Sequence, residues 1–181
     1  MKRICVFAGS RRGAMPEYSA AAKALGRELV SRGLGLVYGG GKLGLMGVIA
    51  DQVLELGGHV TGIIPDSLII KEQAHQGVSE MHVVTTMHQR KAMMVDLSTG
   101  FIALPGGLGT LDETFEILTY NQLGIHDHPC GLLNVEGYYD SLLHFLNHSI
   151  DQEFVREAHK SLIIVDADVS QLVDRIASNN S

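Results

Sequence analysis

Short apolar runs alternate along the chain with longer segments in which apolar residues recur every three or four positions. The runs predict buried strands at residues 2–8, 34–38, 60–64, 81–85, 101–104, 130–135 and 162–165. The longer segments predict helices at residues 17–31, 45–56, 88–97 and 111–122, and further helical patterns follow the last two runs. Alternating strands and helices are typical of βαβ units. The sequence therefore predicts an α/β fold, a Rossmann-like, doubly wound parallel sheet with helices on both faces.

Composition narrows the class of protein. The chain has 181 residues, 45% of them hydrophobic and 19% charged, which predicts one globular domain over residues 1–181. Its net charge of −6 disfavours a nucleic-acid binder. We expect no membrane span and no targeting segment, because the apolar runs are short. The two cysteines, Cys5 and Cys130, lie in apolar runs and favour a reducing cytoplasm over a disulfide scaffold.

Three glycine-rich turns each follow a predicted strand, so we expect them to meet at the carboxyl edge of the sheet. The richest is Gly106-Gly107-Leu108-Gly109-Thr110, which precedes a helix. Free N–H groups at a helix start attract anions, and glycine lets a ligand approach the backbone closely. The turn therefore predicts a phosphate site, although a tight turn that binds nothing has the same pattern.

The other two turns are more ambiguous. Ser10, after Gly9, is placed to bond a ligand or to cap the next segment. The sequence from Gly39 to Gly44 fits the dinucleotide fingerprint and raises an NAD-linked oxidoreductase as one alternative. However, this fingerprint opens the second βαβ unit, and the next strand reaches Pro65 with no acid before Asp66. The Walker A pattern is absent, because Leu43 stands where Ser or Thr is required.

Charged residues near the same edge have two interpretations each. Thr110 and Glu113 fit a capping box, and Glu113 is equally placed to be a catalytic carboxylate beside the phosphate site. Glu116, one turn further on, is a second carboxylate or a solvated one. Arg90 and Lys91 begin a predicted helix, where they could bind a phosphate or be ordinary surface cations.

No metal site is expected from the nine histidines. His144 and His148 have the spacing of a zinc-binding helix, but Phe145 replaces the glutamate of that motif and no third ligand is obvious.

The segment PGGLGTLDE at residues 105–113 resembles PGGxGTxxE, the signature of the Lonely Guy (LOG) family. Further similar segments are residues 5–10, 39–47 (GGGKLGLMG), 87–91 (MHQRK) and 123–139, so that the resemblance extends from about Lys2 to about Leu143. Members of this family are cytokinin riboside 5′-monophosphate phosphoribohydrolases, often mislabelled as lysine decarboxylases. A decarboxylase would need pyridoxal phosphate on a lysine, and Lys42, Lys71 and Lys91 lack a supporting context.

The resemblance implies an enzyme that hydrolyses the N-glycosidic bond of adenosine 5′-monophosphates, with or without an N6 group, to a free base and ribose 5-phosphate. It implies a homodimer and no metal or organic cofactor. It assigns catalysis to Arg90 and Glu113. The substrate and phosphate contacts that it implies are Ser10, Gly40, Gly41, Glu72, Lys91, Gly106, Gly107, Leu108, Gly109, Thr110 and Thr119. A nucleotide-binding carrier or sensor without turnover is the alternative, but mere binding does not need both Arg90 and Glu113.

Overall fold

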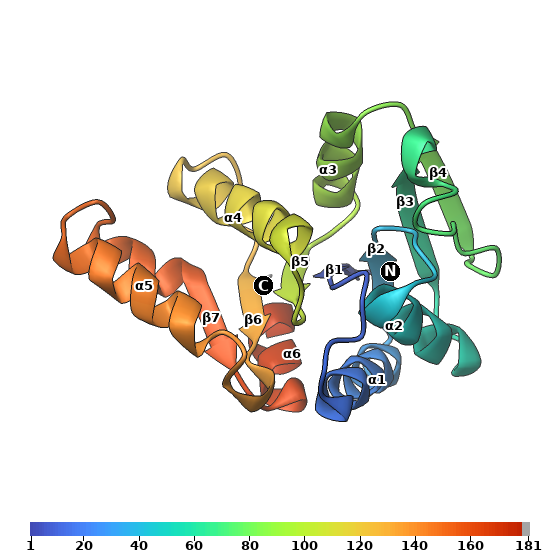
Figure 1. Cartoon of the computed structure of the whole chain (residues 1–181), viewed down its shortest axis with the longest axis horizontal. Coiled ribbons are helices and arrows are strands. Elements are labelled where there is room, and N and C mark those ends of the chain that lie inside the picture. The colour runs from blue at the N-terminus through green and yellow to red at the C-terminus, as the bar shows by residue number, and fades with distance from the viewer. Residues whose placement is uncertain (179–181) are drawn as a thin grey trace.

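The computed structural model describes residues 1–178 (Figure 1). These residues form a seven-stranded sheet in the order β4-β3-β2-β1-β5-β6-β7, in which every neighbouring pair is parallel. The strands are β1 (Arg3–Phe7), β2 (Gly35–Tyr38), β3 (Val60–Pro65), β4 (Glu80–Val84), β5 (Gly100–Ala103), β6 (Cys130–Leu133) and β7 (Ile163–Asp166). The predicted Rossmann-like fold is confirmed, and each predicted strand is present within two residues of its expected bounds.

Helices cover both faces of the sheet (Figure 1). They are α1 (Pro16–Ser31), α2 (Gly44–Glu55), α3 (Met87–Asp96), α4 (Leu108–Gln122), α5 (Asp140–Asp151) and α6 (Val169–Ser178), with short 3-10 turns at η1 (Asp66–Leu68), η2 (Val135–Gly137) and η3 (Glu157–Leu162). Helices α1, α2 and α6 pack on one face, and α3, α4 and α5 on the other. None of the helices in residues 1–178 is both long and apolar enough to cross a membrane.

The strand β1 shows why the sheet buries both of its faces. Ile4 and Val6 belong to the core under α1, α2 and α6, whereas Cys5 and Phe7 belong to the core under α3 and α4. Successive side chains of a strand point to opposite faces, so a strand between two helix layers must be apolar at every position. This requirement explains why the strands appear in the sequence as continuous apolar runs rather than as alternating ones.

The chain changes direction within the sheet at β1, and this positions the candidate site. Strand β1 lies between β2 and β5, and the helices that follow β1 and β5 cover opposite faces. The loops after these two strands therefore separate at the carboxyl edge and leave a crevice, as expected at a topological switch point. A single backbone hydrogen bond joins the two loops, from the Gly9 N–H to the Pro105 carbonyl (3.1 Å). The predicted meeting of the glycine-rich turns is thus confirmed.

Candidate active site

A cavity of about 160 Å³ opens at this crevice. It gathers residues from five parts of the chain: the loop after β1, the start of α2, the loop before β4, helix α3 and the start of α4. Its lining residues are Ala8, Gly9, Ser10, Met46, Glu72, Arg90, Gly107, Leu108, Gly109, Thr110 and Glu113. Most of the residues that the sequence analysis assigned to a nucleotide site therefore share one cavity. Ser10 faces this cavity and does not cap a helix, since α1 begins after Met15.

Arg90 is a buried cation held by backbone carbonyls at the ends of two strands. The residue is 5% exposed; its Nε donates to the Ile63 carbonyl and its Nη2 to the Gly39 carbonyl, both at 3.1 Å. A Cβ atom on Gly39 would lie only 2.1 Å from Nη2. A side chain at position 39 would therefore displace the guanidinium from the place in which these two carbonyls hold it. The interpretation of Arg90 as a surface cation is wrong.

Glu113 lies in the second turn of α4 and points into the cavity. Gly107 is the N-cap of this helix, which begins at Leu108, three residues before its predicted start. Thr110 is consequently inside the first turn, and the capping-box interpretation of Thr110 and Glu113 is wrong. Glu113 is 9% exposed, and its burial raises the pKa of the carboxyl group to about 7 in spite of the opposing effect of Arg90.

Two carboxylates flank the Arg90 guanidinium. Oε1 of Glu113 lies 3.5 Å from Nη1, and Oε2 of Glu72 lies 4.0 Å from Nη2. Oε2 of Glu72 is buried and has no hydrogen-bond partner among the described residues. A buried acceptor without a partner is costly, so this oxygen is available to a ligand hydroxyl or amino group.

The N-terminus of α4 also lines the cavity. The first N–H groups of any helix have no partner within it, and here they belong to Leu108, Gly109 and Thr110. A Cβ atom on Gly106 would lie 2.1 Å from Oγ1 of Thr110, so the turn closes this tightly only with glycine. Together with the helix dipole, these N–H groups form a site suited to a phosphate.

Several predicted contacts lie outside the lining of this cavity. Lys91 forms ion pairs with Asp112 and Glu116, so Glu116 is also occupied. Thr119 is exposed, and its hydroxyl donates to the Phe115 carbonyl at 2.7 Å. Lys91 and Glu116 nevertheless line a small pocket together with Glu113, so they lie next to the site, whereas Thr119 is not in the lining of either pocket.

The remaining glycines support the site from outside. Gly40 and Gly41 lie behind Glu72: a Cβ atom on Gly41 would be 3.3 Å from that of Glu72. Gly106 lines a neighbouring cavity of about 340 Å³, which also contacts Ser10 and Gly107.

As regards metals, the described residues contain no group of three or more His, Cys, Asp or Glu side chains that could hold an ion.

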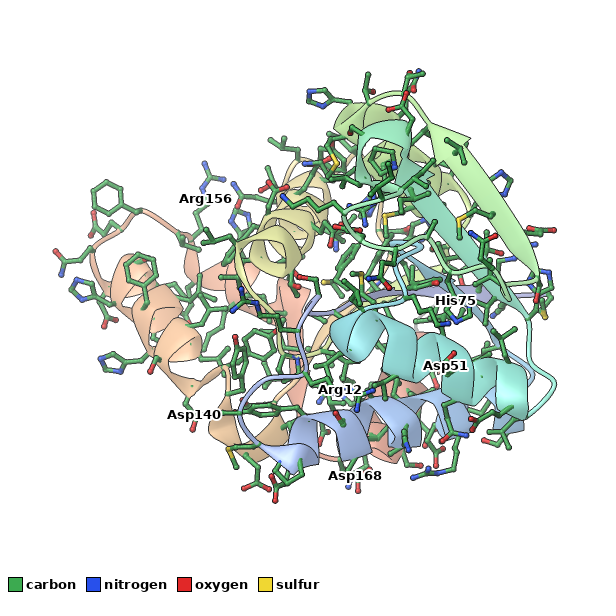
Figure 2. The ribbon with its side chains drawn as sticks, turned by 45° about the vertical axis from the view of Figure 1, so that its right-hand side comes forward. Arg12, Asp51, His75, Asp140, Arg156 and Asp168 are labelled. Carbon is green, nitrogen blue, oxygen red and sulfur yellow. The ribbon has the colours of Figure 1, made fainter. Side chains whose placement is uncertain are left out.

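The neighbouring cavity contains residues to which the sequence assigned no role. Arg11 and Arg12 lie on its rim, and Tyr18 and Tyr138 are among its lining residues; Figure 2 marks Arg12 above α1. The Tyr138 hydroxyl donates to the Gly106 carbonyl at 2.5 Å and so supports the glycine-rich turn from behind. No sequence pattern indicates this contact, because Tyr138 is 32 residues away from the turn.

Comparisons with known proteins agree with this description. Residues 46–176 match the family model described as "Possible lysine decarboxylase". The chain is 50% identical over 175 residues to cytokinin riboside 5′-monophosphate phosphoribohydrolase LOG1 of Arabidopsis thaliana, covering 97% of this chain and 82% of that protein. It is 47% identical to the probable enzyme LOGL6 of Oryza sativa subsp. japonica, covering 97% and 70%.

Among solved structures, the molybdenum cofactor carrier protein of Chlamydomonas reinhardtii superposes with a TM-score of 0.75 at 22% identity, over 98% of this chain and 97% of that one. The corresponding protein of Rippkaea orientalis gives 0.71, also at 22%. At this identity the likeness concerns the fold alone.

The fold and the cavity place the molecule among Rossmann-like α/β proteins, with a cavity at the β1–β5 switch point. The sequence relationship is more specific. The chain belongs to the family of the cytokinin riboside 5′-monophosphate phosphoribohydrolases, the LOG family, as its signature motif predicted.

Proposed function

We propose that this protein hydrolyses the N-glycosidic bond of adenosine 5′-monophosphates, plain or N6-modified, and releases the free base and ribose 5-phosphate. The observation that carries the proposal is one cavity lined both by the buried Arg90–Glu113 pair and by the N-terminus of α4. Membership of the phosphoribohydrolase family supports it. Nothing in this chemistry requires a metal or an organic cofactor.

The phosphate is assigned to the N–H groups of Leu108, Gly109 and Thr110. Binding the phosphate there anchors the substrate at a point remote from the bond to be broken, and this binding energy helps to orient the ribose. A nucleoside lacks the anchor, which explains why a monophosphate would be required.

We assign to Glu113 the catalytic role at the reacting carbon, C1′ of the ribose. Cleavage of an N-glycosidic bond develops positive charge at C1′ of the ribose, and a nearby carboxylate stabilises that charge and can orient or deprotonate the attacking water. A carboxyl group with a pKa of about 7 is suited to accepting a proton near neutral pH. The water oxygen bonds to C1′, the base leaves with the bonding electron pair and is protonated as it departs.

We assign to Arg90 and Glu72 the role of orienting the bound substrate. The guanidinium balances the negative charges of Glu113 and of the incoming phosphate, and Oε2 of Glu72, which has no hydrogen bond within the protein, accepts one from the sugar or the base. Both side chains are in place in the free protein, so little reorganisation is needed when the substrate binds.

We also propose that the protein acts as a homodimer in the cytoplasm. Helix α5 has no fully buried residue, and large apolar side chains on and around α4 and α5 are exposed, including Leu108, Leu123, Ile125 and Phe145. Leu123 and Ile125 directly follow the end of α4 and are both more than half exposed, and neighbouring exposed apolar side chains of this kind are typical of an interaction surface. Cys5 and Cys130 are free and buried, which suits a reducing compartment. Sedimentation equilibrium tests the dimer.

The experiment that tests the reaction is chromatography of the products after incubation with AMP, N6-prenylated AMP and adenosine. We expect free base and ribose 5-phosphate from both monophosphates and little from adenosine. Equal cleavage of adenosine would contradict the phosphate site. Tight binding of AMP without release of base would favour the alternative, a nucleotide carrier or sensor.

A further inference from the structure

The segment that carries Glu72 has little regular structure of its own. This Glu72 loop, defined as residues 66–79, runs from the end of β3 to the start of β4 and contains only the short turn η1. Gln73, next to Glu72, has a left-handed φ of +50°. A non-glycine residue keeps such a conformation only when its surroundings impose it. The contacts around the loop therefore determine where the Glu72 carboxylate lies.

The backbone of the loop is bonded to the same glycine turn that holds Arg90. The Lys42 N–H donates to the carbonyls of Glu72 (3.2 Å) and Gln73 (2.9 Å), and the His75 N–H donates to the Gly40 carbonyl (2.9 Å). The carbonyl of Gly39 in turn accepts from Arg90. Glu72 and Arg90 are thus placed relative to each other by one shared turn.

One side-chain contact fixes the loop to a helix. Nε2 of His75 lies 2.8 Å from Oδ1 of Asp51 on α2, and Figure 2 shows these two residues beside each other. The Gly77 N–H donates to Nδ1 of His75 at 3.1 Å. Because Nδ1 accepts, Nε2 carries the ring hydrogen and donates it to Asp51. The side chain of His75 is 7% exposed and that of Asp51 is 54% exposed.

We propose that the His75–Asp51 pair positions Glu72 for substrate binding. His75 is a positioning residue: its backbone N–H holds the glycine turn and its ring ties the loop to α2, so that losing the ring contact frees the loop. Glu72 then loses its fixed place near Arg90, and the substrate contact assigned to it weakens. The proposal rests on the function proposed above, since Glu72 matters only if the cavity binds the nucleotide.

The first test is steady-state kinetics with AMP for His75→Ala and Asp51→Ala. We expect KM to rise by about tenfold, the size of one lost hydrogen bond to a charged group, with a much smaller change in kcat. His75→Gln, whose amide can still donate to Asp51, should recover most of the loss. Unchanged KM in both alanine variants would overturn the proposal. Asp51→Ala serves as the second variant if His75→Ala does not fold, because Asp51 is largely exposed.

The matched control is His59→Ala. His59 also faces a carboxylate, with Nε2 3.8 Å from Oε1 of Glu80, but it precedes β3 and so lies at the opposite edge of the sheet. We expect its KM to stay at the wild-type value. A rise equal to that of His75→Ala would mean that any histidine pair affects KM, and would contradict a specific role for the loop.

A double-mutant cycle separates positioning from general stability. Glu72→Gln should raise KM in the wild-type background and add little in the His75→Ala background, since the loop is already displaced there. Effects that multiply would show that the two residues act independently and would overturn the proposal.

Hydrogen–deuterium exchange gives a readout that does not depend on turnover. The amides of Lys42 and His75 should exchange faster in Asp51→Ala than in the wild type, with the amides of β5 unchanged. If these two amides keep their wild-type protection, the proposal is wrong. If wild-type protein releases no base from AMP but the exchange result holds, the proposed reaction has failed while the contact between the loop and α2 stands.

Discussion

Nη1 of Arg90 lies 3.5 Å from Oε1 of Glu113, and both groups are almost fully buried. The cation reduces the cost of ionising the carboxyl group, and the burial of the carboxyl group increases it. Burial dominates, since the pKa of Glu113 is raised to about 7 rather than lowered. The pair therefore holds a carboxyl group that changes its charge near neutral pH.

Glu113→Gln should abolish most turnover while leaving AMP binding intact. The amide keeps the size of the side chain but cannot stabilise positive charge at C1′, and removing one such group typically lowers the rate by about 10²–10³-fold. The measurements are base release and the dissociation constant of AMP by calorimetry. Glu157→Gln, the same change at an exposed acid in η3, is the control. Turnover within twofold of wild type would leave Glu113 without a catalytic role.

Arg90→Ala should weaken both AMP binding and turnover, each by about tenfold or more, because the guanidinium contacts two strand ends and lies between two carboxylates. The same two measurements apply, with exposed Arg156→Ala as the control (Figure 2). A normal rate in Arg90→Ala would show that the guanidinium only supports the fold.

The rate should depend on pH through Glu113. If its carboxylate is the reactive form, kcat/KM for AMP rises with pH and levels off above a midpoint near 7. Arg90 and, more weakly, Lys91 lower this pKa, so Arg90→Gln should move the midpoint to higher pH, and Lys91→Met should do so by less. The phosphate of AMP titrates near pH ~6 in every variant and cancels in the comparison. Identical midpoints would exclude Glu113 as the titrating group.

Ionisation of Glu113, which should raise the rate as the pH increases, should lower the stability of the folded protein over the same pH range. The pKa of Glu113 is higher in the folded protein than the ordinary value of 4.5, so its contribution is fully present below about pH 4.5 and is lost as the pH rises through 7. Glu113→Gln should therefore be more stable than wild type at pH 8, by roughly 2–3 kcal/mol beyond any difference at pH 4.5. Urea unfolding at both pH values measures this. A difference independent of pH would contradict the raised pKa.

Gly109→Ala tests the phosphate site without disturbing the fold. A Cβ atom at this position would meet no atom within 4 Å, and Gly109 lines the cavity, so the added methyl group projects into the space assigned to the phosphate. We expect unchanged or higher thermal stability, because alanine favours a helix more than glycine does, and AMP affinity lower by tenfold or more. If Gly109→Ala binds AMP with wild-type affinity, the phosphate does not bind at the N-terminus of α4.

The sequence predicted the sheet well because the inner strands are buried on both faces and are therefore nearly continuous apolar runs, as β2 and β3 are. It misplaced the start of α4 because Gly107-Leu108-Gly109 has the composition of a loop, while the observed helix begins within it. The order of strands also matters: the carbonyls that hold Arg90 belong to Ile63 and Gly39, which are adjacent only because β3 pairs with β2.

Two features decide which of the predicted residues reach the cavity: the direction in which a helix turns each side chain, and the path of the loop that carries Glu72. Arg90 and Lys91 are neighbours in sequence, but a rotation of about 100° along α3 turns one to the cavity and the other to the acids of α4. The hydrophobic pattern of the four or five residues around Arg90 is too short to show which side of the helix faces the cavity. Glu72 lies in a loop whose path depends on contacts with Lys42 and Asp51, which the local sequence does not predict.

The missing side chain at position 39 makes two distant positions depend on each other. Because the Arg90 guanidinium occupies the volume that a Cβ atom would need, alanine at 39 displaces the guanidinium as long as Arg90 is present and does not once Arg90 has been shortened, so the order of the two replacements matters. If Arg90 is replaced by a shorter residue, position 39 can accept a side chain. While Arg90 is retained, the residue 51 positions earlier in the chain is held to glycine by the place of the guanidinium.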